Sequence, residues 1–438
     1  MTAHAELATR TKAATLASWT AQNAWNPLTM DRAEGVYFWD ADGKQYLDWS
    51  SQLINVNVGH GHPHVVKAIQ EQAGKICYAY PGIATEPRAK LGELLRDVTP
   101  HNLSKSFFTC SGAEAVENAM KIARLYSGKQ KILTRYRSYH GGTFGAMTAG
   151  GDPRRLANEP GVPWIVRMPD PYPYRNPIYR GLSVEEGEKA LTDIIEDTIL
   201  FEGPENMAAI MLEGYSGSSG IMQGGETYWR RIQEICDRYN ILLIIDEVMS
   251  GFGRTGEWFG INHYPYVKPD IMTVAKGLTS GYVPLGAAIV TDEIASYFDD
   301  HVLWGGLTYS SHTLGCATGI ANIEVYQNEN LIENSREMGK KLRKGLNDLA
   351  EQHKSIGEIR GVGLHHVIEL VKNRDTRDPI SGWNQPASEP MRKVAGKLRE
   401  LGMSTFVKWD WIFCSPPPII KDDEIQEGLS MIDDGPSN

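Results

Sequence analysis

Cysteine is scarce in this sequence, with five residues among 438. Their number is odd, their positions run from Cys77 to Cys414, and no pair has CxxC spacing. The pattern therefore indicates neither a disulfide framework nor a cysteine-ligated zinc site, and we expect a reduced, cytoplasmic setting. No apolar run approaches the roughly 20 residues of a membrane span, and the start of the chain lacks the apolar core of a signal peptide, so we expect no membrane association.

Basic residues are outnumbered: Lys and Arg total 44, Asp and Glu total 54, and the net charge is −10. A general nucleic-acid binder needs a basic surface for phosphate contacts, so we expect no nucleic-acid partner. The content of 41% hydrophobic and 22% charged residues is ordinary for a globular protein. The length exceeds what one hydrophobic core usually supports, so we expect more than one domain.

From about residue 65, short apolar runs alternate with amphipathic helical segments. One helical segment covers 112–126, and another contains Trp229, Ile232 and Cys236 at helical spacing. This alternation predicts an α/β fold in which helices flank both faces of a mostly parallel sheet. The runs that we expect as strands are 106–109, 131–134, 208–213, 241–246, 271–275 and 286–290.

The pattern changes on either side of this region. Before residue 60, the pair Asp42–Gly43 between aromatic runs predicts a hairpin. After residue 316, a long helical stretch precedes short strands within 361–370 and 405–414, which predicts a smaller α+β domain. We therefore divide the chain into an N-terminal segment (1–60) that packs with the small domain, a large domain (61–315) and a small C-terminal domain (316–438).

Polar residues at the carboxyl ends of the expected strands are the candidates for chemistry, because α/β sheets bind ligands there. Asp246 ends one strand, Glu213 ends another, and Lys276 follows a third. A strand-end aspartate is often a cap or an ion-pair partner, but in a dry site it can pair with a protonated ring nitrogen or a metal. No histidine lies at ligand spacing from Asp246, so we predict no metal centre.

Lys276 and the helix start at Ser111 can each be interpreted in two ways. A single lysine such as Lys276 usually extends to solvent, yet at a buried strand end its pKa can fall and it can form a Schiff base with a carbonyl group. Ser111 and Glu114 have capping-box spacing. The same helix start can bind an anion through the free amides of Gly112 and Ala113, and the two interpretations are compatible.

Taken together, these residues supply the parts of a pyridoxal 5′-phosphate (PLP) site. The helix start at Ser111 would hold the phosphate, and an aromatic residue such as Tyr139 would stack on the ring. Asp246 would pair with the pyridinium nitrogen, and Lys276 would bind the aldehyde carbon. We therefore predict PLP as the cofactor.

Motifs of one known family occur in order along the sequence, in the blocks Trp25–Thr29, Asp42–Asp48, Gly59–Pro63, Ser111–Ala115, Tyr139–Gly141, Ile245–Gly256, Pro269–Gly277 and Thr308–Ser310. The chain resembles the class III (ω-amino acid type) aminotransferases of PLP fold type I over nearly its whole length. Within that family it is most similar to the taurine aminotransferases. The resemblance implies a large domain with a mostly parallel sheet and a smaller α+β domain.

The resemblance also implies roles for the matching residues. Lys276 would carry the cofactor and then move the proton, while Asp246 would keep the ring nitrogen protonated. Val248 and Tyr139 would cover the two faces of the ring. The remaining implied positions are Ser111, Gly112 and Ala113 at the phosphate, Glu213 near the ring, and Thr308, which the family donates to the phosphate site of the partner subunit in a homodimer.

One departure from the family concerns the substrate. Many members have an arginine in an Arg-x-x-Pro-Pro pattern that binds a substrate carboxylate, but here Trp411–Cys414 precede Ser415-Pro416-Pro417 without one. The nearest cation is Lys408, which stands among aromatic residues and resembles the taurine aminotransferases at this point. We therefore expect Trp25, Tyr139 and Lys408 to bind the substrate.

The function that we expect is transamination from a terminal amine donor, taurine, to a 2-oxo acid, either 2-oxoglutarate or pyruvate, by a ping-pong mechanism. Another ω-amino acid or amine transaminase acting on β-alanine or γ-aminobutyrate is one alternative. A PLP-dependent aminomutase or racemase is another, because the same fold hosts both. A non-catalytic binding protein is disfavoured by the intact set of Lys276, Asp246 and Tyr139.

Overall fold

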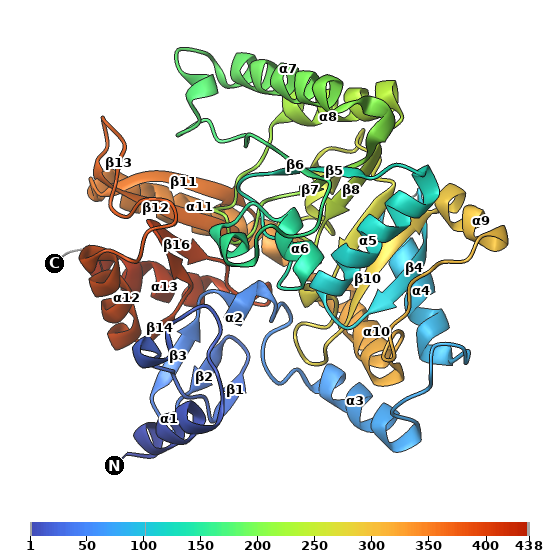
Figure 1. Ribbon diagram of the computed structural model, residues 1–438. Helices are drawn as coiled ribbons and strands as arrows, with labels where there is room; N and C mark the ends of the chain where they lie inside the picture. The colour runs from blue at the N-terminus through green and yellow to red at the C-terminus, as the bar shows by residue number, and fades with distance from the viewer. Residues whose placement is uncertain (1, 101, 436–438) are drawn as a thin grey trace.

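The computed structural model describes residues 2–100 and 102–435 (Figure 1). Within them, a seven-stranded sheet has the order β4–β10–β9–β8–β7–β5–β6. The strands run in one direction except β10, which is antiparallel to both of its neighbours. Their bounds are β4 (Leu103–Thr109), β5 (Lys131–Arg135), β6 (Ile165–Met168), β7 (Met207–Glu213), β8 (Leu242–Asp246), β9 (Ile271–Val274) and β10 (Gly286–Thr291).

Helices cover both faces of this sheet, so the predicted α/β class is confirmed. On one face, α5 (Gly112–Ser127) and α6 (Phe144–Ala149) bury small apolar side chains against β5, β7 and β8. On the other face, the larger apolar cluster includes side chains of α3 (Pro63–Lys75), α4 (Glu86–Val98), α7 (Val184–Glu202), α8 (Glu226–Tyr239) and α10 (Thr313–Asn328). Figure 1 shows α5 and α6 in front of the strands.

All six apolar runs expected as strands are strands, with bounds within three residues of the expected ones. Their burial explains this agreement, because every residue of β7 and β9 is buried and a continuous apolar run is what such a strand requires. The sequence reading missed β6, which lies at the edge of the sheet and pairs only with β5. Its residues are half-buried apart from Met168, so their pattern is weaker.

Two smaller sheets lie beside the large one. The expected hairpin forms from β2 (Tyr37–Trp39) and β3 (Gln45–Asp48), with Gly43 between them at φ +87°. The first small sheet has the order β1 (Arg32–Glu34), β2, β3, β14 (Met403–Ser404). The second has the order β11 (Ile356–Val362), β12 (His365–Asn373), β16 (Trp411–Cys414), β15 (Val407–Lys408), and β13 (Asp378–Pro379) pairs with β12.

The remaining helices lie toward the two ends of the chain or beside the large sheet: α1 (Ala3–Ala14), α2 (Ser51–Ile54), α9 (Asp292–Asp300), α11 (Leu331–Gln352), α12 (Glu389–Leu401) and α13 (Asp422–Asp434). Pro63 is the first residue of α3, as its preference for this position indicates. In the described part of the chain, no helix combines the length and apolar character that crossing a membrane requires.

Candidate active site

A cavity of about 480 Å³ lies at the carboxyl ends of the central strands, which is where ligands bind in α/β sheets. Most of the predicted site residues line it, although the first and last of them, Ser111 and Lys276, are 165 positions apart in the sequence. The structure therefore brings together Ser111, Gly112, Ala113, Tyr139, Glu213, Asp246, Val248 and Lys276.

Strand register explains why two of these side chains are neighbours. Glu213 is the last residue of β7 and pairs in register with Asp246, the last residue of β8. Asp246 in turn pairs with Thr273 of β9, three residues before Lys276. The two carboxylates and the lysine thus emerge from adjacent parallel strands at one edge of the sheet.

Asp246 is buried, with 4% of the residue exposed, and both of its oxygens have partners. His140 Nδ1 lies 2.7 Å from Oδ2, and the backbone amide of Val248 donates to Oδ1 at 3.0 Å. The other ring nitrogen of His140, Nε2, is buried and has no hydrogen-bond partner among the described residues. His140 and the amide of Val248 therefore fix the orientation of the carboxylate, and both His140 and Asp246 line the cavity.

Lys276 begins a short 3₁₀ turn directly after β9, with its backbone at φ +44°. A residue with a Cβ rarely adopts this left-handed conformation, and strain of about 1–3 kcal/mol is typical of functional sites. Burial lowers the pKa of Lys276 to about 8, and the carboxylates of Asp246 and Glu213 only partly offset that effect. A neutral, nucleophilic amine is therefore present at a pH well below the value at which an ordinary lysine loses its proton.

The start of α5 faces the same cavity and fits both interpretations of its sequence. Ser111 is the N-cap, and its Oγ accepts the amide of Glu114 at 3.3 Å. The earlier amides of Gly112 and Ala113 have no partner within a helix and border the cavity. A Cβ on Gly112 would lie 2.8 Å from Val248 Cγ1, so only glycine lets this turn approach so closely. The helix start thus offers amides and the positive end of its dipole to an anion.

Glu213, which lines the cavity, and the buried Glu247 next to Asp246 are both held by local hydrogen bonds. Glu213 accepts the amides of Tyr139, at 3.0 Å, and of Gly217. Glu247 accepts from Ser250 Oγ and from the amides of Gly260 and Ile261. Burial raises the pKa of both groups, that of Glu247 to about 7.

Arg154 supplies a cation to the cavity, and the sequence reading did not select it. Its guanidinium lies 3.7 Å above the ring of Tyr139 and 5.4 Å from that of Trp19, which also lines the cavity. Nε and Nη2 donate to the carboxylate of Asp152 at 2.7 and 3.1 Å, and Nη2 also donates to Ser218 Oγ at 3.0 Å. Nη1 has no hydrogen-bond partner among the described residues, which leaves one face of this cation for a ligand.

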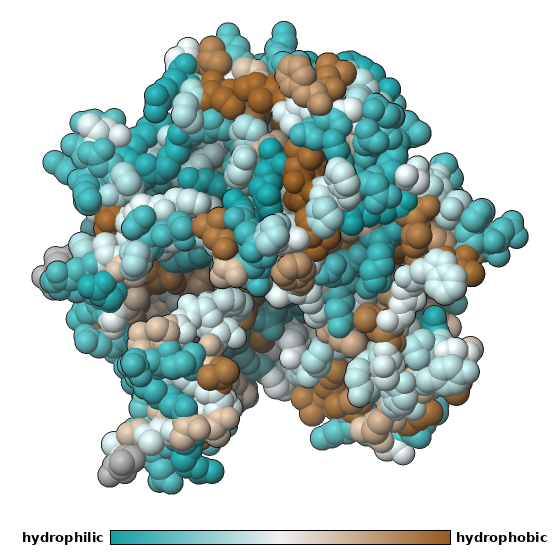
Figure 2. All heavy atoms as spheres, viewed as in Figure 1, coloured by the Kyte–Doolittle hydropathy of each residue, from teal (hydrophilic) through white to brown (hydrophobic). Residues whose placement is uncertain are grey.

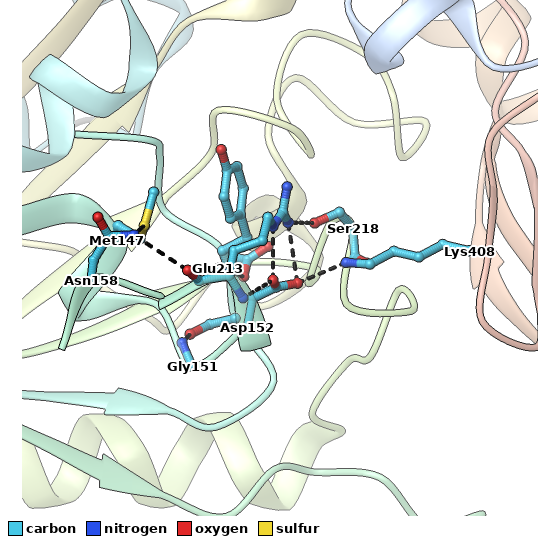
Figure 3. Close-up of polar contacts among 10 residues, drawn as sticks. Met147, Gly151, Asp152, Asn158, Glu213, Ser218 and Lys408 are labelled. Atoms are coloured by element: carbon cyan, nitrogen blue, oxygen red, sulfur yellow. Dashed lines mark hydrogen bonds and ion pairs between the residues drawn. The ribbon is translucent and has the colours of Figure 1, made fainter. Parts of the chain in front are cut away.

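Three predicted site residues are not among the described residues that line the cavity. Lys408 Nζ donates to Asp152 Oδ2 at 2.7 Å (Figure 3), and Lys408 is not among the residues that line the cavity. Trp25 is half-buried in the N-terminal segment, and the cavity contains Trp19 instead. Thr308 is exposed, and its carbonyl accepts the hydroxyl of Tyr78 at 2.7 Å.

The signals for the missed residues were weak. His140 belongs to a recognised block, but nothing in the sequence shows that its ring turns toward Asp246. Arg154 follows Asp152-Pro153, a cap and first-turn pair that begins the 3₁₀ segment Pro153–Asn158. Asp152 and Pro153 predict that a turn begins here, but they do not predict that the guanidinium of Arg154 lies over the ring of Tyr139.

These residues fit PLP. The buried Asp246 can face a ring nitrogen, and the amides at the start of α5 can hold a phosphate. The lysine amine has a lowered pKa, as a Schiff-base lysine requires. Tyr139 and Val248 line the space between these groups, so the apolar lining suits an aromatic ring.

Comparisons with known proteins agree with this geometry. The family model "Aminotransferase class-III" matches residues 19–435. A taurine–pyruvate aminotransferase of Bilophila wadsworthia is 38% identical over 393 residues, covering 85% of this chain and 84% of that protein. A putrescine–pyruvate aminotransferase of Pseudomonas aeruginosa is 35% identical over 415 residues, covering 91% and 88%.

Among solved structures, a taurine:2-oxoglutarate aminotransferase of Bifidobacterium kashiwanohense, in complex with PLP and glutamate, superposes with a TM-score of 0.95. It is 39% identical, and the match covers 100% of this chain and 98% of that one. Family model, sequence relatives and structure thus agree over almost the whole chain. The chain belongs to the class III aminotransferases, is an enzyme that transfers amino groups, and uses PLP as its cofactor.

Proposed function

We propose that this aminotransferase takes the amino group of taurine and transfers it to a 2-oxo acid. The observation that carries the proposal is Arg154, a cation on the wall of the cavity that also contains Lys276. A compact donor with an amine at one end and an anion at the other needs such a cation at some distance from the reacting lysine. The taurine aminotransferases among the relatives support the same donor.

The absence of an arginine before Pro416 also favours a donor without an α-carboxylate. Trp411–Cys414 form the buried strand β16, whose side chains pack in the core and leave no cation there. The positive charge that meets the substrate then comes from Arg154, on a different element. Taurine carries a sulfonate two carbons from its amine, which suits a single cation opposite Lys276.

The residues that would hold PLP follow from the geometry of the cavity. The phosphate would bind the amides of Gly112 and Ala113 and the side chain of Ser111, while Tyr139 and Val248 would cover the ring. When bound, PLP supplies an electron sink that makes the carbon next to the donor nitrogen acidic.

Lys276 would move the proton of the reaction at its Nζ. With its pKa lowered to about 8, the amine can accept a proton from the donor carbon that bears the nitrogen and deliver it to the cofactor carbon on the other side of that nitrogen near neutral pH. Asp246 would hold a proton on the ring nitrogen, because a buried carboxylate favours the positive form of its partner. His140 would keep Asp246 in the orientation that this pairing needs.

Glu213 lies where it can balance the charge of the cavity. Its carboxylate is held by two backbone amides beside Tyr139, so it cannot rotate into the cavity without losing them. We propose that it acts as a fixed negative group near the ring. The acceptor is either pyruvate or 2-oxoglutarate, since relatives that use each one are similarly close.

We propose a homodimer whose subunits share their active sites through Thr308. Thr308 is exposed and lies in a surface segment with exposed aromatic side chains, among them Tyr78, Trp304 and Tyr309. The rings of Tyr78 and Tyr309 pack edge to face, with their centroids 5.9 Å apart. Exposed apolar patches of this kind are typical of subunit interfaces. Figure 2 shows apolar residues interrupting the polar surface of the visible face, including the lower right block that holds α3.

The predicted division of the chain into residues 1–60, 61–315 and 316–438 remains a proposal, as does the cytoplasmic location. Support for the packing of the N-terminal segment with the small domain comes from a shared apolar cluster that includes Leu47, Trp49, Leu342 and Ile368. Met403 of β14 also pairs with Leu47 of β3.

A donor and acceptor screen tests the proposed function. The holoenzyme is assayed with taurine, β-alanine, γ-aminobutyrate and putrescine, each with pyruvate and with 2-oxoglutarate. We expect taurine to give the highest kcat/KM. Activity on putrescine and other amines without any on taurine would instead assign the enzyme to the general amine transaminases.

A further inference from the structure

Lys408 reaches the active site through another residue. It lies in β15, and its Nζ donates to Asp152 Oδ2 at 2.7 Å and to the carbonyl of Ser218 at 3.2 Å (Figure 3). The ammonium also lies 4.1 Å from the ring of Trp409. These contacts keep the ammonium of Lys408 away from the cavity, and Lys408 is not among the described residues that line it.

Asp152 is the shared partner of two cations. Only 3% of its side chain is exposed. Oδ1 accepts from Arg154 Nε at 2.7 Å, and Oδ2 accepts from both Arg154 Nη2 and Lys408 Nζ. The carboxylate therefore clamps the guanidinium in one plane above Tyr139, and Lys408 lies on the same oxygen as Nη2.

The charges of this cluster do not cancel. Two cations share one carboxylate, so a net positive charge remains on the side of Arg154 that borders the cavity. Without Lys408, Asp152 and Arg154 would form a neutral pair, and the carboxylate would compete with a substrate anion for the same guanidinium.

We propose that Lys408 and Asp152 are positioning residues that set the specificity for anionic donors by holding and polarising Arg154, without touching the donor themselves. This inference rests on the proposed function, because it takes Arg154 as the group that meets the donor anion. Lys408 shares Oδ2 of Asp152 with Arg154, so the carboxylate keeps Arg154 in place without neutralising it, and the free Nη1 can donate to a sulfonate.

The surroundings of Lys408 make this effect pH-dependent. Burial lowers the pKa of Lys408 to about 8, against the opposing effect of Asp152; Arg154 lowers the pKa further and Glu213 raises it slightly. Below a pH of about 8 the ammonium is present and offsets part of the negative charge of Asp152, which leaves more of the positive charge of Arg154 for a donor anion. Above pH 8 the charge is lost, and binding of anionic donors weakens.

A double-mutant cycle separates action through Asp152 from direct contact. The variants are Lys408→Met, Asp152→Asn and the double variant. Each is assayed as the holoenzyme with taurine and with the neutral isostere 2-(methylsulfonyl)ethylamine. We expect Lys408→Met to raise KM for taurine roughly tenfold, the scale of one charge-assisted contact, with little change in kcat. The KM of the neutral donor should stay unchanged.

In the Asp152→Asn background, the further change Lys408→Met should have less than about a twofold effect, because the carboxylate through which Lys408 acts is gone. The same tenfold loss in both backgrounds would overturn the inference and make Lys408 a direct ligand. No loss in either background, or equal losses with both donors, would also overturn it.

Rescue by Lys408→Arg provides a second measurement, which holds even if Asp152→Asn does not fold. The arginine keeps its charge at all relevant pH values, so KM for taurine should stay low above pH 8, where it rises in the wild type. A rise of equal size in both proteins would contradict the proposal. Lys344→Met, at an exposed lysine of α11, is the control for the loss of a lysine elsewhere.

Failure of the proposed function gives a different pattern. If the wild type does not use taurine, the same cycle is measured with β-alanine, whose carboxylate places an anion at a similar distance from the amine. If the effects of Lys408→Met and Asp152→Asn are independent in that cycle, the inference about Lys408 and Asp152 is overturned, whatever the outcome for taurine. An enzyme that accepts neutral amines and no anionic donor overturns both.

Discussion

Replacing Arg154 by methionine should convert the enzyme from one that prefers anionic donors into one that does not distinguish them. The side chain is half-buried, and its guanidinium lies 3.7 Å above the ring of Tyr139, so methionine loses this cation–π contact but fills part of the same space. Asp152 retains the ammonium of Lys408 at 2.7 Å, so the substitution does not leave a buried carboxylate unpaired. We therefore expect the variant to fold and to bind PLP.

The magnitude follows from the contacts that are lost. Arg154 Nη1 is the donor left free for a substrate anion, and one charge-assisted hydrogen bond contributes about 1.5–3 kcal/mol. At about 1.4 kcal/mol for each factor of ten, kcat/KM for taurine should fall roughly 10- to 100-fold. The neutral isostere 2-(methylsulfonyl)ethylamine has the same shape without the charge, so its kcat/KM should change by less than about threefold.

Coupled assays of product formation with both donors, together with a thermal melt, measure this effect. The ratio of the two kcat/KM values cancels any general loss of active enzyme. A fall of the same size for both donors would make Arg154 a structural residue of the cavity. An unchanged value for taurine would show that its sulfonate binds elsewhere.

Four further predictions address the other residues of the site. Lys276→Ala should abolish turnover, and borohydride reduction followed by mass spectrometry should place PLP on Lys276 of the wild type; an adduct on another lysine would refute its role. Asp246→Asn should retain PLP but slow turnover roughly 100-fold or more, since an amide cannot stabilise the positive ring nitrogen, and a rate near that of the wild type would remove Asp246 from this pairing. Apoenzyme should take up PLP faster as pH rises, with a midpoint near 8 that reflects the lowered pKa of Lys276, whereas a midpoint near 10 would contradict the burial argument. Mixing Lys276→Ala chains with Thr308→Ala chains should restore some activity through hybrid sites, and failure despite proven subunit exchange would indicate self-contained sites.

The core of the fold could be predicted because burial on both faces leaves a strong signal. The runs that became β7 and β8 are apolar up to their last residues, Glu213 and Asp246, and the buried strand β9 is followed two residues later by Lys276. That regularity alone located Glu213, Asp246 and Lys276. The start of α5 was predictable for a similar local reason, namely a serine cap between a strand and a helix.

The cations near the wall of the cavity that we propose to face the substrate were not predictable in the same way. Lys408 was chosen because it is the cation nearest to the motif that lacks its arginine. Its position in the structure depends on Asp152, which is 256 residues away. Arg154 lies in the short 3₁₀ segment Pro153–Asn158, whose sequence does not show what it packs against, so only the folded chain shows that Arg154 lies over Tyr139. Pairings between distant loops leave no pattern in a single sequence.

The measurement that tests the central claim most directly is a half-reaction of the PLP-loaded enzyme with taurine in the absence of any 2-oxo acid. Transfer of the amino group to the cofactor should release about one equivalent of 2-sulfoacetaldehyde for each Lys276 site and then stop until pyruvate or 2-oxoglutarate is added, as a ping-pong mechanism requires. Release of no aldehyde from taurine, by an enzyme that completes the same half-reaction with a neutral amine, would contradict the proposed function.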